Sequence, residues 1–138
     1  MFFEGAHRLL ESGVSVVPCR PTGSDRVAVE AYPALAARHW VEKQGYKNDK
    51  PGKQTPEQRE ARQKIMYGLT HGAVKYYGIE VLIEDRATQE MVDDPTGDTM
   101  DGLLCALQAA HAYLERNDGW GIPDDIDVSE GWIAGESK

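Results

Sequence analysis

The sequence predicts an α/β fold in a single domain over residues 1–138, in which a few strands alternate with helices. Three observations predict it. Residues 26–33 alternate with a period of two and include β-branched residues, which is typical of a strand. The segment Thr55-Pro-Glu-Gln combines a capping residue, a first-turn proline and a glutamine, which indicates a helix start. Residues 98–114 place bulky apolar side chains on one stripe of a long helix.

The first part of the chain is predicted to hold two helices and two extended segments. Residues 2–12 form a helix with an apolar side, and Gly13 is typical of a helix end. Residues 14–18 form a short extended segment, and residues 26–33 form the best strand in the sequence. Because a proline fits the first position of a helix, residues 33–44 are expected to form the next one.

The middle of the chain begins with a polar, basic loop over residues 46–54. The helix that starts at Thr55 is expected to run to about Thr70. Residues 78–84 then predict a second strand, and residues 87–92 a short helical piece.

The helix over residues 98–114 is the longest one expected. Its apolar stripe consists of Met100, Leu103, Leu104, Leu107, His111 and Leu114. The opposite side carries the small residues Asp98, Asp101, Gly102, Cys105, Ala109 and Ala112. Because an exposed helix would show longer charged residues there, we expect this helix to be covered on both sides. A short terminal strand is predicted over residues 129–133.

The charge of the chain is unevenly distributed. With 15 basic and 23 acidic residues the net charge is −8, which argues against a protein that coats nucleic acid. Residues 38–64 nevertheless hold eight basic and four acidic residues, whereas residues 65–138 hold four basic and fifteen acidic ones. This asymmetry suits an enzyme that binds phosphates at one site and cations at another. An ordinary solvated loop explains the basic segment equally well.

Cys19 and Cys105 lie far apart, and the N-terminus lacks the pattern of a signal peptide. Apolar runs are too short to cross a bilayer. A soluble cytoplasmic protein without a membrane contact is therefore expected.

Asp98 and Asp101 are the strongest candidates for a functional site, because carboxylates are the ligands that hard cations such as Mg²⁺ prefer. A structural alternative exists, since aspartate also caps helices and offsets the helix dipole in the first turn. Glu30 lies near the carboxyl end of its strand, where open α/β sheets place their ligands, although a lone strand glutamate is commonly just surface. The acids at 124, 125 and 127 are interpreted as a solvated turn.

Three segments together resemble the C-terminal half of domain-of-unknown-function family 429, predicted nucleases of the ribonuclease-H-like superfamily. The segments are Val29-Glu-Ala-Tyr-Pro, then Tyr46-Lys with Arg59 and Arg62 downstream, then Asp98-Thr-Met-Asp-Gly-Leu-Leu-Cys-Ala-Leu with Glu130-Gly-Trp-Ile at the end. The start of the last segment also resembles the final acidic motif of Holliday-junction resolvases in that superfamily.

This resemblance implies a partial ribonuclease-H-like fold and a metal-dependent nuclease. By it, Glu30, Asp98 and Asp101 are the catalytic residues that hold Mg²⁺ or Mn²⁺. Lys47, Arg59 and Arg62 match the basic middle of the family, and the resemblance implies that they bind the phosphates of a nucleic acid.

The chain departs from the family pattern at its beginning. Ribonuclease-H-like folds open with an antiparallel meander whose first strand carries an essential aspartate, and the sequence has neither. We expect either a truncated chain or a partner that supplies the missing strands, and a homo-oligomer that covers the open strand edges. The alternative function is a non-catalytic interaction module derived from that fold. The nuclease hypothesis requires Glu30 to lie close to the two aspartates.

Overall fold

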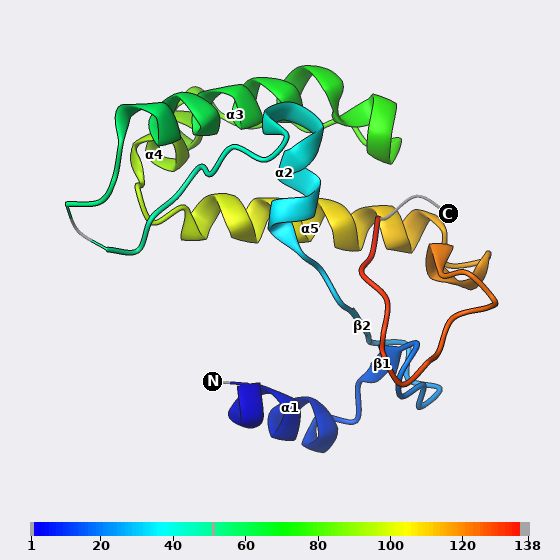
Figure 1. Cartoon of the computed structure of the whole chain (residues 1–138). Helices are drawn as coiled ribbons and strands as arrows, with labels where there is room; N and C mark the ends of the chain where they lie inside the picture. Colours follow the sequence, from blue (N-terminus) through cyan, green and yellow to red (C-terminus); the bar gives the residue numbers. More distant parts are fainter. Residues whose placement is uncertain (1, 51, 136–138) are drawn as a thin grey trace. The chain divides into compact units, whose positions relative to one another are not determined.

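The computed structural model describes residues 2–50 and 52–135. Within these residues the architecture is mixed α/β, as predicted, with five α-helices and a parallel pair of strands (Figure 1). The chain divides into two compact units. Unit 1 consists of Met1–Ala31 and Ala112–Lys138, and unit 2 consists of Tyr32–His111. The single domain over residues 1–138 stays a prediction.

Unit 1 contains helix α1 (Phe2–Glu11), strands β1 (Ser15–Val17) and β2 (Val27–Val29), and the short 3₁₀ helix η1 (Gly119–Gly121). The two strands pair in parallel, with Ser15 opposite Val27 and Val17 opposite Val29. The predicted helix and both predicted extended segments are thus present, although the strands are short.

The terminal strand predicted over residues 129–133 is wrong, because an isolated parallel bridge between Glu30 and Ile133 is all that forms there. The backbone of Gly131 has a φ of +79°, a left-handed conformation that interrupts an extended segment.

Unit 2 contains the helices α2 (Pro33–Val41), α3 (Pro56–Tyr77), α4 (Asp85–Asp93) and most of α5 (Asp98–Leu114). Helices α2 and α4 both pack against α3 (Figure 1). The largest fully buried side chains of this unit include Ile65, Leu69, Tyr77, Met100 and Leu104. Helix α3 is therefore the central element, and its apolar side forms the core together with α5.

The start of α3 follows the sequence closely. The Thr55 side chain accepts a hydrogen bond from the backbone N–H of Gln58, and the Gln58 side chain accepts one from the backbone N–H of Thr55. This reciprocal capping is the one predicted. The helix continues past the predicted Thr70 to Tyr77, where Gly78 ends it in a left-handed conformation.

The strand predicted over residues 78–84 is wrong, because residues 79–84 have no strand partner. Ile79, Val81 and Ile83 are half-buried against the core, whereas Leu82 is 85% exposed. The alternation in the sequence thus reflects an extended segment that lies with one side on helices, without a neighbouring strand.

Helix α5 spans the predicted residues, and Met100, Leu104 and Leu107 of its apolar stripe are buried. Two finer expectations are wrong. Leu114 is 52% exposed at the end of the helix, and the small residues Gly102 and Ala109 on the opposite side are exposed. Ala112 on that side is buried, so the opposite side of the helix is covered only in part. In the part of the chain that the structure describes, no helix combines the length and apolar character needed to cross a membrane.

Candidate functional site

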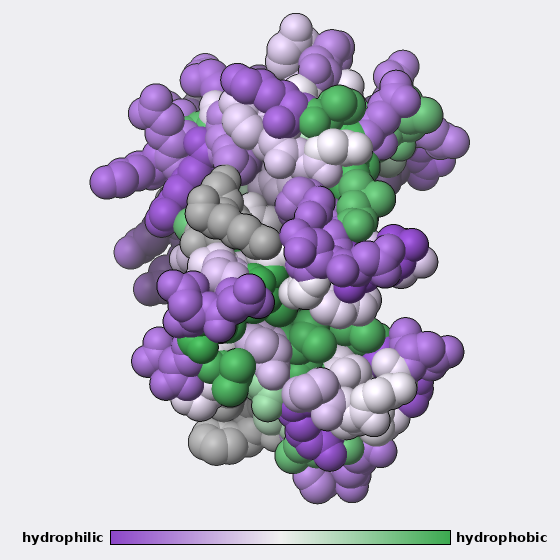
Figure 2. Space-filling model, turned by 90° about the vertical axis from the view of Figure 1, so that its right-hand side faces the viewer, coloured by the Kyte–Doolittle hydropathy of each residue, from purple (hydrophilic) through white to green (hydrophobic). Residues whose placement is uncertain are grey.

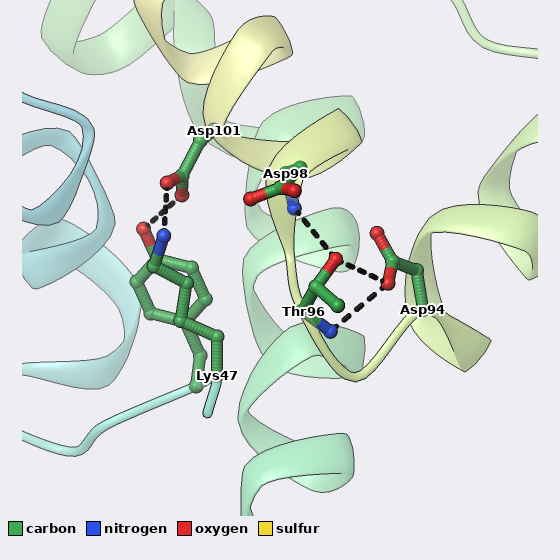
Figure 3. Close-up of polar contacts among 6 residues, drawn as sticks. Lys47, Asp94, Thr96, Asp98 and Asp101 are labelled. Carbon is green, nitrogen blue, oxygen red and sulfur yellow. Dashed lines mark hydrogen bonds and ion pairs between the residues drawn. The ribbon is translucent and has the colours of Figure 1, made fainter. Parts of the chain in front are cut away.

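The start of α5 is capped by residues that precede it. The Asp94 carboxylate accepts hydrogen bonds from the backbone N–H of Thr96 at 2.9 Å and from the Thr96 hydroxyl at 2.7 Å. The Thr96 hydroxyl oxygen in turn accepts from the backbone N–H of Asp98 at 3.4 Å (Figure 3). The bond from the Thr96 hydroxyl is the main reason why the pKa of Asp94 lies below its usual value. Asp94 and Thr96 therefore do the capping, a role that Asp98 or Asp101 could have had by sequence.

Both carboxylate oxygens of Asp101 are engaged by a segment from far earlier in the chain. The Tyr46 hydroxyl donates to Oδ1 at 2.5 Å, and the Lys47 ammonium donates to Oδ2 at 2.6 Å (Figure 3). The bond to Asp101 is the largest cause of the raised pKa of Lys47. Burial, followed by the same carboxylate, raises the pKa of Tyr46. At neutral pH Asp101 thus faces a cation and a neutral phenol donor.

Asp98 lies one helical turn before Asp101 and is exposed. Among the described residues, none donates a hydrogen bond to its carboxylate. Figure 3 shows Asp98 between the Lys47–Asp101 pair and the Thr96–Asp94 cap. Its charge adds to the raised pKa of Lys47, so Lys47 lies within the electrostatic reach of both aspartates.

Lys47 is held at this place by close packing and backbone bonds. Gly97 has a φ of +69°, and a Cβ atom added to it would lie 3.0 Å from Cβ and 3.1 Å from Cδ of Lys47. The stem of Lys47 therefore lies directly on the backbone of Gly97. Gln58 donates to the backbone oxygen of Lys47 at 3.1 Å, and Asn48 donates its backbone N–H to Pro95 at 3.1 Å.

The two arginines predicted to bind phosphate lie in the same unit but are already engaged. Arg62 is 3% exposed and donates to the backbone oxygens of Val92 at 2.8 Å and Tyr46 at 2.7 Å. Arg62 thus links the last turn of α4 to the loop that carries Tyr46. Arg59 is exposed and donates to the Asp93 carboxylate at 3.0 and 2.7 Å. Phosphate binding by either residue stays a prediction.

Glu30 directly follows β2 in unit 1 and is exposed. Its backbone oxygen accepts a hydrogen bond from Ala134 at 2.8 Å. Its carboxylate oxygen Oε2 would lie 2.9 Å from a Cβ atom added to Gly131. The carboxylate therefore packs directly against Gly131. Because Glu30 and the aspartates belong to different units, a joint site of all three carboxylates stays a prediction.

The donor chemistry at the start of α5 fits a hard divalent cation. Mg²⁺ is commonly bound through one or two carboxylates together with water and substrate phosphates. Asp98 and Asp101 supply two carboxylates, and the ammonium of Lys47 shows that this place accepts a positive charge. Within residues 2–50 and 52–135, no group of three or more His, Cys, Asp or Glu side chains is arranged to hold a metal ion.

Cys105 lies one turn after Asp101 and is half-buried. Burial and the nearby Asp101 charge raise the pKa of its thiol. Because the thiolate is the reactive form, Cys105 is poorly suited to act as a nucleophile near neutral pH.

Comparison with known families identifies one match. The family described as "Protein of unknown function (DUF429)" matches residues 8–127, which is most of the chain. The chain belongs to this family. No curated protein and no solved structure matches it. All six predicted site residues lie inside the DUF429 match, whereas the Glu130–Ile133 segment lies beyond it.

Sequence reasoning missed the roles of Tyr46, Asp94 and Thr96 in the site. Asp94 and Thr96 stand directly before α5, on either side of Pro95. A carboxylate followed two residues later by a hydroxyl is itself typical of a local turn and cap, and this signal could have found them. Tyr46 precedes Lys47 in the motif that carried the family resemblance, but no chemical role followed from that position.

Proposed function

We propose that the start of α5 binds a divalent cation, Mg²⁺ or Mn²⁺, in a site for phosphodiester hydrolysis. The proposal rests on the observation that the residues that cap this helix are not the two aspartates of its first turn. Asp94 and Thr96 cap the helix, so the two first-turn aspartates are not needed as caps. Asp98 is exposed, and Asp101 binds the Lys47 ammonium, a positive charge that a divalent cation would replace. The resemblance of the chain's motifs to those of ribonuclease-H-like nucleases supports the same reaction class.

The residues of the chain have distinct roles in this proposal. Asp98 and Asp101 hold the cation, and Glu30 is the third carboxylate that the resemblance adds. When bound, such a cation activates a water molecule and stabilises the leaving oxygen. Lys47 supplies a positive charge beside the two aspartates. This positive charge attracts a phosphate group.

Cleavage of a fluorescent oligonucleotide tests this function. We expect hydrolysis by the full chain with Mg²⁺ or Mn²⁺ that stops in EDTA and falls at least tenfold in Asp98→Asn/Asp101→Asn. The matched control is Asp124→Asn/Asp125→Asn, which removes two exposed carboxylates outside the site. Absence of metal-dependent cleavage in the wild type, or an equal loss in both double variants, would contradict the proposal.

A second candidate is a non-catalytic module that assembles through its apolar surface. Its support is a set of large apolar side chains that are more than half exposed: Leu10, Tyr67, Val74, Leu82, Tyr113, Leu114 and Val128. Figure 2 shows hydrophobic residues between hydrophilic ones on one face of the molecule. The engagement of Asp101 and Arg62 by internal partners also suits a structural role.

A further inference from the structure

A groove of about 660 Å³ lies between Trp40 of α2 and one side of α3, outside the site described above. The floor of this α2–α3 groove is formed by Gly68 and Gly72, against which the indole of Trp40 packs. A Cβ atom at Gly68 would lie 2.1 Å from the Trp40 ring, and one at Gly72 would lie 3.7 Å from it. The two glycines therefore let the Trp40 indole lie directly on the backbone of α3, where it forms one wall of the groove.

Two tyrosines that line the groove are each stacked against the imidazole ring of a histidine. Tyr67 stacks on His71 with ring centroids 4.2 Å apart, and Tyr76 stacks on His39 at the same distance. Tyr67 is 67% exposed and Tyr76 is 39% exposed. Tyr67 is supported by its histidine and is the more accessible of the two rings for a planar ligand. The Lys75 ammonium lies over the Tyr76 ring at 5.0 Å from its centroid, so a base that stacks on Tyr76 must displace this ammonium. Burial lowers the pKa of His39, which keeps its stack with Tyr76 neutral.

The charge of the groove is opposite to that of the whole chain. Lys64 and Lys75 line it, and none of its described lining residues is acidic, although the chain carries a net charge of −8. The two lysines are eleven positions apart on α3, which corresponds to about 16 Å along a helix axis. They can therefore contact phosphates at two separate positions of an extended strand.

We propose that the α2–α3 groove binds single-stranded nucleic acid, with bases stacked on Tyr67 and Tyr76 and phosphates near Lys64 and Lys75. Stacking platforms combined with cations along a groove are the general chemistry of single-strand binding. A duplex keeps its bases stacked on one another and cannot use the tyrosines in this way. The inference stands apart from the proposed metal site, because no groove residue belongs to that site.

Binding of a fluorescein-labelled single-stranded oligo-dT to the full chain, measured by anisotropy in EDTA, tests the proposal. EDTA prevents cleavage and separates this result from the fate of the proposed metal site. We expect binding that weakens about tenfold or more in Tyr67→Ala/Tyr76→Ala, because base stacking on aromatic rings contributes on this scale. Tyr67→Phe/Tyr76→Phe retains the ring faces and is expected to bind nearly as well as the wild type.

Matched controls separate the groove from general surface effects. Tyr113→Ala removes an exposed tyrosine outside the groove, and its affinity should equal that of the wild type. Lys64→Gln/Lys75→Gln should weaken binding and reduce its salt dependence, whereas Lys43→Gln/Lys53→Gln should leave both largely unchanged. Circular dichroism of each variant verifies that it is folded.

Three outcomes would overturn the proposal. The first is absence of oligo-dT binding, or equal binding by the wild type and the folded Tyr67→Ala/Tyr76→Ala variant. The second is equal affinity for a duplex of the same length. The third is equal affinity for a mononucleotide, which would assign the groove to a small ligand.

Discussion

Lys47 and Asp101 form the contact that organises the candidate site. The two side chains are 34% and 20% exposed, so water screens the pair only in part. We expect Lys47→Met to destabilise the fold by about 1 kcal/mol at pH 7, because Asp101 keeps its charge and loses its cation. Urea unfolding measures this, with the exposed Lys43→Met as control. Equal destabilisation by both variants would contradict a specific pair.

The stabilisation that the Lys47–Asp101 pair provides is expected to be lost at alkaline pH. The folded-state pKa of Lys47 is raised above its ordinary value of 10.5. Its contribution to stability is therefore complete below that value and is lost as the pH rises through the folded-state pKa. The stability difference between the wild type and Lys47→Met should accordingly be constant from pH 6 to pH 9 and shrink only as the pH rises through the folded-state pKa, above 10.5.

The contribution of Asp94 to the stability of the fold is expected to be lost at low pH, whereas that of Lys47 is lost at high pH. Asp94→Ala removes the cap of α5 and should cost about 1 kcal/mol at pH 7. Because the pKa of Asp94 is lowered from 3.8, its contribution is present above that value and is lost as the pH falls through the lower folded-state pKa. Urea unfolding at pH 7 and near pH 2.5 tests this. A cost unchanged at low pH, or one matched by the exposed Asp124→Ala, would contradict the capping role.

Residue-scale prediction from sequence succeeded where chemistry is local and failed where it depends on distant partners. The two aspartates were identified from their spacing at a helix start. The contacts of Asp101 with Tyr46 and Lys47 join positions more than fifty residues apart. Arg62 likewise donates to backbone oxygens in the loop before α3 and in the last turn of α4. Such contacts follow from tertiary packing and have no signature in a local pattern.

At the scale of elements, helix starts with capping chemistry were predicted well. Thr55, Gln58 and Pro33 stand where the sequence indicated. The segment at 78–84 was misassigned because apolar alternation also arises in a single extended segment that packs on helices. The period of the apolar residues indicates only which side of a segment is buried. A strand also requires hydrogen-bond partners for its backbone groups.

The packing of α2 on α3 depends on one glycine. Gly68→Ala would bring a methyl group to within 2.1 Å of Trp40, and we expect destabilisation of about 1–3 kcal/mol. Gly102→Ala is the control, because nothing lies within 4 Å of its added Cβ in an exposed position of α5. This control should stabilise the protein by about 0.5–1 kcal/mol. Urea unfolding of both variants measures the contrast, and a stable Gly68→Ala would contradict the close contact.

At the scale of the whole molecule, the predicted homo-oligomer remains to be measured. We expect the mass from light scattering to exceed that of one chain and to fall in Leu82→Glu, because Leu82 is the most exposed large apolar residue among those described. Lys50→Glu, which changes an exposed polar position, serves as control. A monomeric mass for the wild type at high concentration would contradict the prediction.

The central claim is that the first turn of α5 binds a divalent cation. Isothermal titration of the full chain with Mn²⁺ tests it most directly. The proposal predicts saturable binding that is lost in Asp98→Asn/Asp101→Asn, retained in Asp124→Asn/Asp125→Asn, and strengthened in Lys47→Met, where no ammonium competes for Asp101. Absence of binding by the wild type, or equal binding by the wild type and Asp98→Asn/Asp101→Asn, would contradict it.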